Sequence, residues 1–166
     1  MHYSIFSLFF LYFIKKICYN IYREKKKERI KMRLWHQKLL PYLPRQQLLG
    51  QHRECCALRG KGWDRKHSVV NYVFTHDPAF LAAYHALVMD EMINRGYNPD
   101  KTWYKKQWRG NILQEAKNWC DETLCNRLYG NATEGSCMIY PEHNDEYLQE
   151  CLENLSGKGI TIDFSK

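Results

Sequence analysis

Several familiar patterns are missing from this 166-residue sequence. Its longest apolar stretch, residues 3–14, is twelve residues long, whereas a helix that crosses a bilayer needs about 20. The chain also has no glycine-rich phosphate loop, no serine in a nucleophile-elbow pattern and no pair of carboxylates in an acid–base pattern. These absences argue against a membrane-spanning protein and against the commonest nucleotide-binding and hydrolase sites.

A second absence divides the chain at Met32. Residues 1–31 contain no Gly, Ala, Pro, Val or Asp, and 20 of them are Phe, Ile, Lys, Asn or Tyr, the residues with the most AT-rich codons. We interpret 1–31 as AT-rich leader DNA read in frame, or as a disordered extension, and 32–166 as the functional domain. A signal peptide is disfavoured because no small-residue cleavage site follows the apolar stretch. A weak N-terminal membrane anchor remains an alternative.

Removing the leader changes what the charge implies. The leader holds eight of the 25 basic residues but only two of the 18 acidic ones, so the rest of the chain is nearly neutral. Residues 32–66 nevertheless carry eight basic and two acidic side chains, while residues 111–166 carry four and ten. This asymmetry favours a nucleic-acid-binding surface in the first third and a solvated acidic surface in the last.

The seven cysteines do not form a recognisable framework. Cys55 and Cys56 are adjacent, and Cys120 and Cys125 are not spaced as a Cys-x-x-Cys pair. We therefore expect reduced thiols in a cytoplasmic protein, with no bound metal and no cofactor.

The apolar spacing predicts an all-α fold, a compact single-domain bundle of three to four helices with irregular connections. Asp77 is the expected N-cap of the clearest helix, Pro78 lies inside it, and Gly96 follows its end. A loop and an extended stretch are expected over residues 60–75. On the first helix, the face with Gln51 and Glu54 is expected to be polar and to lie opposite the core. The four helices are predicted at residues 45–58, 78–95, 111–128 and 141–155.

Three segments then show a resemblance to a known family. Residues 32–34 and 43–54, with Arg33 and the Arg53-Glu54 pair, resemble the amino-terminal segment of the pyrimidine-dimer DNA glycosylase family, which includes bacteriophage endonuclease V. Residues 74–98 align with the same family without a gap, and residues 139–143 resemble the entry to its last helix. The Met32 to Glu54 separation is one residue longer than in the family, Gln47 replaces a family histidine, and residues 101–137 have no clear counterpart.

The resemblance implies a DNA repair enzyme that acts on damaged, double-stranded DNA as a monomer. The α-amine of Met32 would attack the sugar carbon that holds the damaged base, forming a Schiff base, and Glu54 would assist AP-lyase cleavage. An α-amine has a pKa near 8, so about a tenth of it is neutral at pH 7. The residues expected at the DNA are Arg33, Gln47, Arg53, Arg59, Lys61, Trp63, Arg65 and Lys66.

The sequence leaves two other functions open. The first is a non-catalytic nucleic-acid-binding protein of the same fold, which would use the same basic residues without an active amine. The second is a metal-dependent hydrolase that uses His36, His52 or His67, since imidazole is a common zinc ligand.

Overall fold

The central helix forms where its end signals predicted it. The computed structural model describes residues 33–65 and 69–164. In it, α3 (Pro78–Asn94) begins at the N-cap Asp77, whose carboxylate accepts a hydrogen bond from the Ala79 N–H at 2.8 Å. Gly96, just beyond the helix, has φ +79°, a left-handed conformation that glycine adopts without strain. Local sequence signals therefore determine both ends of α3.

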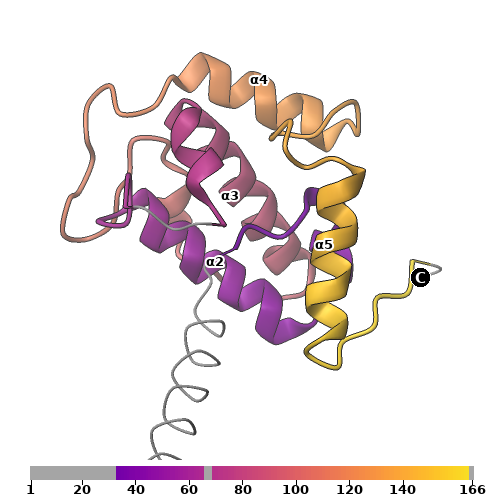
Figure 1. Cartoon of the computed structure of the whole chain (residues 1–166). Coiled ribbons are helices and arrows are strands. Elements are labelled where there is room, and N and C mark those ends of the chain that lie inside the picture. Colours follow the sequence, from indigo (N-terminus) through magenta and orange to yellow (C-terminus); the bar gives the residue numbers. More distant parts are fainter. Residues whose placement is uncertain (1–32, 66–68, 165–166) are drawn as a thin grey trace, which may run out of the picture. The chain divides into compact units, whose positions relative to one another are not determined.

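α3 packs between two other helices, α2 (Arg45–Arg59) and α4 (Glu122–Thr133) (Figure 1). Its buried side chains include Leu81, Tyr84, Val88 and Met89, which follow the helical spacing. The prediction of an all-α fold is confirmed, because the described residues contain four α-helices, three short 3-10 helices and no strand. None of these helices is long and apolar enough to cross a membrane.

The predicted third helix is wrong in position. Residues 111–120 are irregular, with Gln114 and Asn118 at positive φ, and the helix begins only after Asp121. The Asp121 carboxylate accepts a hydrogen bond from the Leu124 N–H at 3.0 Å and so caps α4. Left-handed residues interrupt a helix before its hydrogen bonds can propagate, which explains the later start.

Two further boundaries differ from the prediction. The last helix, α5 (Asp145–Ser156), starts at the N-cap Asn144 rather than at Pro141, because the Asn144 side chain accepts from the Tyr147 N–H. The stretch expected to be extended contains a 3-10 helix, η2 (Asn71–Thr75), with Val73 in the core. Two more 3-10 helices complete the fold, η1 (Gln37–Tyr42) and η3 (Lys101–Tyr104).

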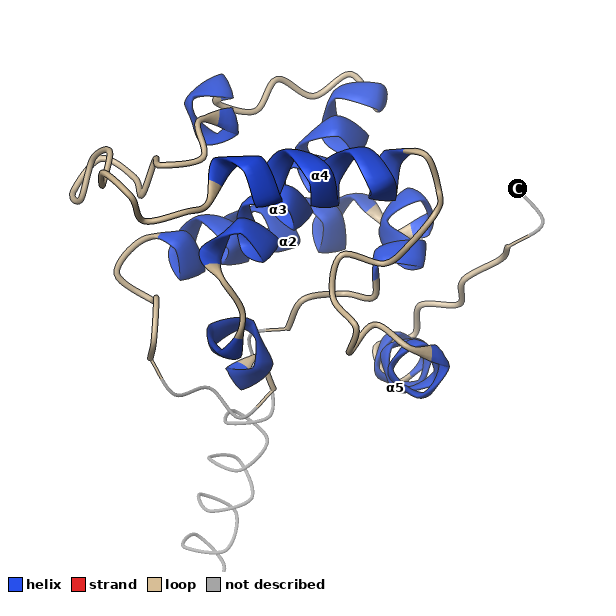
Figure 2. Ribbon diagram, turned by 90° about the horizontal axis from the view of Figure 1, so that it is seen from above, coloured by secondary structure: helices blue, strands red, loops and turns tan. Residues whose placement is uncertain are grey.

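The segment before η1 is held through its backbone. The Tyr84 hydroxyl donates to the Trp35 carbonyl at 2.6 Å, and the Tyr147 hydroxyl donates to the Leu34 carbonyl. These tyrosines come from α3 and α5, and α5 runs across the direction of α4 (Figure 2). Residues 33–36 are therefore fixed between helices, and residues 33–166 form one compact unit.

Candidate functional site

The candidate site is built around the Glu54 carboxylate on α2. Glu54 is half-buried, and its carboxylate accepts a hydrogen bond from the backbone N–H of Arg33. Gln51, one turn earlier, donates from its amide nitrogen to Glu54 Oε2 at 3.4 Å. The same Gln51 accepts from the Trp35 N–H at 2.7 Å. Hydrogen bonds thus connect this carboxylate to the segment that begins at Arg33. Met32, which precedes Arg33 in sequence, lies outside the described residues.

Gln51 corrects one sequence prediction. We expected the face of α2 with Gln51 and Glu54 to lie opposite the core, but Gln51 is completely buried. The segment around Trp35 covers this face, and the buried amide is satisfied because it bonds Trp35 and Glu54. The helical spacing identified a polar face correctly, but it gave no sign of the segment that packs on it.

The environment of Glu54 raises the pKa of its carboxyl. Burial raises the pKa from its ordinary 4.5 to about 7, and the N–H of Arg33 and the charges of Lys158, Arg33 and Arg53 oppose the shift. A carboxyl with this pKa is about half ionised at neutral pH. It can therefore take up and release a proton under physiological conditions, as a general base must.

This raised pKa predicts a pH-dependent stability. The folded state binds the Glu54 proton more tightly than the unfolded chain does, so the free energy of unfolding falls as pH rises from 4.5 to about 7. Glu54→Gln removes this loss and is expected to stabilise the protein above pH 7 by roughly 1–3 kcal/mol, with no gain below pH 4.5. Urea denaturation at both ends of this window measures the effect.

The control for that measurement is Glu153→Gln, which neutralises an exposed carboxylate on α5. It is expected to change the free energy of unfolding by less than about 0.5 kcal/mol at any pH. Equal stabilisation by Glu54→Gln at both ends of the pH window would contradict the raised pKa.

Two cations lie beside this carboxylate. Arg33 is only 7% exposed, and its guanidinium pairs with the Glu150 carboxylate at 2.8 Å. Its Cζ lies 5.9 Å from the centre of the Trp35 ring, and Lys158 Nζ lies 4.9 Å from that centre. Glu150 and Lys158 were not predicted from the sequence, because no motif marks either residue and both lie about 100 residues along the chain from Glu54.

The residues expected at the DNA lie in different environments. Arg33 departs from the prediction, because it is buried and paired with Glu150. Arg53, Lys61 and Arg65 are exposed, so their side chains are accessible to a ligand. Gln47 is half-buried and lies two turns before Glu54 on the same face of α2. Lys66 lies outside the described residues.

The position of Arg59 differs from the prediction. It was expected to contact DNA, but it is 1% exposed, and its guanidinium donates to backbone carbonyls of the 103–108 segment. The shortest of these bonds reach Trp103 O at 2.6 Å and Lys105 O at 2.7 Å. Hydrogen bonds from both terminal nitrogens offset much of the cost of burying this charge. Arg59 therefore holds this segment against α2 and does not face a ligand.

Trp63 packs against other rings. Its ring meets Phe74 and Trp119 edge-on, with centroids 5.2 and 5.4 Å away. Such edge-to-face contacts stabilise a cluster. The structure thus places Trp63 in an aromatic cluster, half-buried rather than fully exposed.

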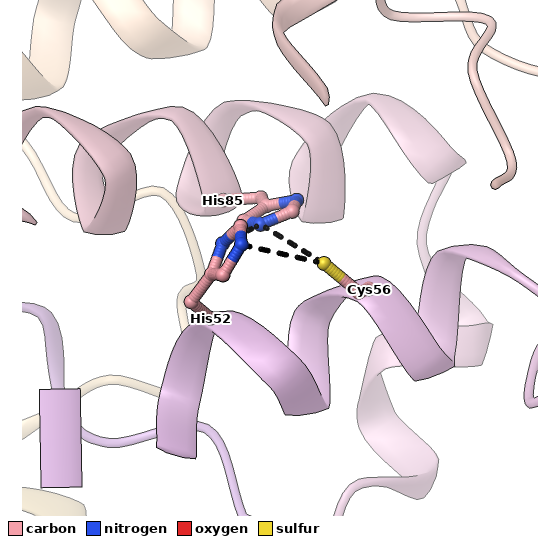
Figure 3. A group of neighbouring side chains, drawn as sticks. All are labelled: His52, Cys56 and His85. Carbon is pink, nitrogen blue, oxygen red and sulfur yellow. Dashed lines mark hydrogen bonds between the residues drawn. The ribbon is translucent and has the colours of Figure 1, made fainter. Parts of the chain in front are cut away.

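His52, Cys56 and His85 form a second group of reactive side chains, drawn in Figure 3. His52 and Cys56 lie one turn apart on α2, and His85 projects from α3; their possible ligand atoms lie within 4.8 Å of one another. Two imidazoles and a thiol are a donor set that zinc accepts. The hydrogen bonds around His85 decide whether it can bind a metal.

Those bonds occupy both nitrogens of His85. Arg59 Nη1, which can only donate, lies 3.2 Å from His85 Nδ1, so Nδ1 accepts and Nε2 carries the hydrogen. That hydrogen points to His52 Nδ1 at 2.8 Å. Burial and the neighbouring Arg59 charge lower the pKa of His85 well below its ordinary value, which agrees with a neutral ring. Metal-binding histidines instead donate their second nitrogen to an acceptor, and Arg59 offers none.

We accordingly expect no tightly bound zinc at this cluster. Protein purified without chelator should contain far less than one zinc per chain by elemental analysis, and chelator treatment should change neither its activity nor its thermal midpoint. Stoichiometric zinc that is lost in His85→Ala, with a matching fall in stability, would overturn this reading.

Two other histidines, His36 and His67, were considered as metal ligands. His36 is 1% exposed; its Nε2 donates to the His143 carbonyl at 2.8 Å, and its Nδ1 accepts from the Lys38 N–H at 3.2 Å. Both nitrogens are therefore used within the core. His67 lies outside the described residues.

Comparison with known proteins bears on the site directly. Residues 32–105 match the family model described as pyrimidine dimer DNA glycosylase. The match includes α2, α3 and Glu54, and it ends before α4 and α5. No curated protein and no solved structure matches the chain. The resemblance to the pyrimidine dimer DNA glycosylase family is thus confirmed over residues 32–105.

Proposed function

We propose that this protein is a DNA repair glycosylase with an associated AP-lyase activity on double-stranded DNA that carries pyrimidine-dimer-type damage. The family match supports the glycosylase class. The form we expect to be active begins at Met32, works as a monomer, and needs no metal or cofactor, because its nucleophile is an amine of the chain itself.

The observation that supports the proposal most directly is the hydrogen bond from the Arg33 N–H to the Glu54 carboxylate. The Arg33 nitrogen is bonded to the carbonyl carbon of Met32, so covalent geometry alone keeps the Met32 nitrogen within about 4 Å of it. A carboxylate that can gain or lose a proton near neutral pH therefore accepts a hydrogen bond from the residue that directly follows Met32 in sequence.

The chemistry then follows in balanced steps. The neutral amine of Met32 attacks the sugar carbon C1′, the bond to the damaged base breaks, and the base leaves with a proton. The amine and C1′ form a Schiff base as the sugar ring opens. Glu54 takes a proton from C2′, and the electron pair expels the 3′ phosphate in a β-elimination. Water finally hydrolyses the Schiff base and frees the amine.

The exposed cations supply the contacts to DNA in this proposal. Arg53, Lys61 and Arg65 are exposed and would contact phosphates, with an affinity that falls as salt rises. Gln47 lies on the same helix face as Glu54, where it would contact the sugar. The preference for pyrimidine dimers rests on the family match alone.

Strand cleavage tests this function. A chain beginning at Met32 is incubated with short duplexes that contain one thymine dimer, one abasic site or no damage. The proposal predicts cleavage at both lesions and none in the intact duplex. Binding without cleavage of either lesion would favour the alternative, a non-catalytic DNA-binding protein of the same fold.

A further inference from the structure

A further exposed cation lies in the turn that follows α5. We propose that Lys158 is an additional DNA-binding residue of the Glu54 site, whose ammonium holds a backbone phosphate beside that carboxylate. The inference rests on the proposed function. It adds a substrate contact from a segment that lies outside the family match at residues 32–105.

The backbone holds Lys158 in one place. The helix ends at Ser156, and the N–H groups of Lys158 and Ile160 both donate to the carbonyl of the buried Leu155, at 2.9 and 3.0 Å. Gly159 permits this turn because its φ is +74°. The side chain thus starts from a closed turn rather than from a free tail.

The side chain then reaches the site. Lys158 Nζ lies 4.9 Å from the centre of the Trp35 ring, a distance at which a cation and an aromatic face attract each other. Trp35 is also the residue whose N–H bonds Gln51, the neighbour of Glu54. Lys158 therefore lies against the residue that bonds the neighbour of Glu54, and the charges of Lys158 and Glu54 interact.

Of the two cations beside Trp35, only Lys158 is available to an anion. Arg33 is 7% exposed and already paired with Glu150. Lys158 is exposed and forms no ion pair with any carboxylate of the described residues. It is also one of only four basic residues after residue 110, against ten acidic ones. An exposed cation that forms no ion pair with these carboxylates suits a phosphate.

A purely structural role is the competing explanation. A lysine just beyond a helix C-terminus stabilises the helix through the helix dipole. That role would affect stability, but it would not change the salt dependence of DNA binding. The groups that face Glu54 are the Arg33 N–H, the Gln51 amide and the charges of Lys158, Arg33 and Arg53, so the loss of the Lys158 charge should move the pH profile of catalysis.

The test measures DNA affinity against salt for the full 166-residue chain on a duplex with a stable abasic analogue. Lys158→Met is expected to reduce the slope of log affinity against log salt by about one, and to weaken binding about three- to fivefold at low salt. Lys158→Arg should keep the original slope. Lys117→Met, which removes an exposed lysine elsewhere, should also leave it unchanged.

The same substitutions are then made in the chain that begins at Met32, and abasic-site cleavage is followed against pH. Lys158→Met should move the rising limb of the profile to higher pH, and Lys117→Met should not. A Lys158→Met protein with the slope and the pH limb of Lys117→Met would overturn the role of Lys158 alone. If the unsubstituted protein neither binds nor cleaves the duplexes, the proposed function fails, and the role of Lys158 fails with it.

Discussion

Glu54→Gln is expected to slow strand cleavage at an abasic site by about 10²- to 10⁴-fold, the usual contribution of a general base. Glutamine keeps the shape of the side chain and can still accept the hydrogen bond from Arg33, but it cannot take the C2′ proton. Because burial raises the pKa of Glu54 to about 7, the wild-type rate should rise with pH through that value. The rate of Glu54→Gln should show no such limb. Single-turnover cleavage measured against pH records both effects.

The fold and the affinity for DNA must survive for this result to be informative. We expect Glu54→Gln to bind the abasic duplex at least as tightly as wild type, because it removes a negative charge from the site. Glu153→Gln removes an exposed negative charge on α5 and should cleave at the wild-type rate. Cleavage by Glu54→Gln within about threefold of wild type would exclude Glu54 as the base.

The second large effect concerns where the chain begins. When abasic duplex is present and borohydride reduces any Schiff base, the 166-residue chain is expected to yield at least about 100-fold less covalent complex than the chain beginning at Met32. In the longer chain the Met32 nitrogen is part of a peptide bond, and its lone pair is delocalised into the carbonyl. An amide nitrogen forms no Schiff base.

Weak binding cannot explain such a loss. Residues 1–31 add eight basic and two acidic side chains, so the longer chain should bind DNA at least as tightly. N-terminal sequencing of the shorter chain must show that Met32 is retained with a free amine. Equal yields of covalent complex from the two chains would show that another amine is the nucleophile.

The elements that the sequence predicted well are those whose ends depend on neighbouring residues. α3 was predicted closely because Asp77, Pro78 and Gly96 act within one turn of the helix ends. α4 was misplaced because residues 111–120 have helical spacing but are irregular, and Arg59 ties the segment just before them to α2 through backbone carbonyls. No local pattern reports such a contact across 50 residues.

The site likewise contains residues that were predicted from the sequence and residues that were not. The Arg53-Glu54 pair lies in one helix, and a resemblance to one family was enough to single out Glu54. Gln51, Glu150 and Lys158 were not predicted as parts of the site. Their importance depends on contacts with Arg33 and Trp35, which are distant from them in sequence. Arg59 was assigned to DNA for its charge alone, although the fold buries it.

The position of the covalent bond to DNA tests the central claim most directly. The chain beginning at Met32 is reduced with borohydride on an abasic duplex, digested, and examined by mass spectrometry to find the residue that carries the sugar. We predict that the sugar is attached to the α-amine of Met32. A sugar on a lysine side chain, or no adduct from protein that still binds the duplex, would contradict the account.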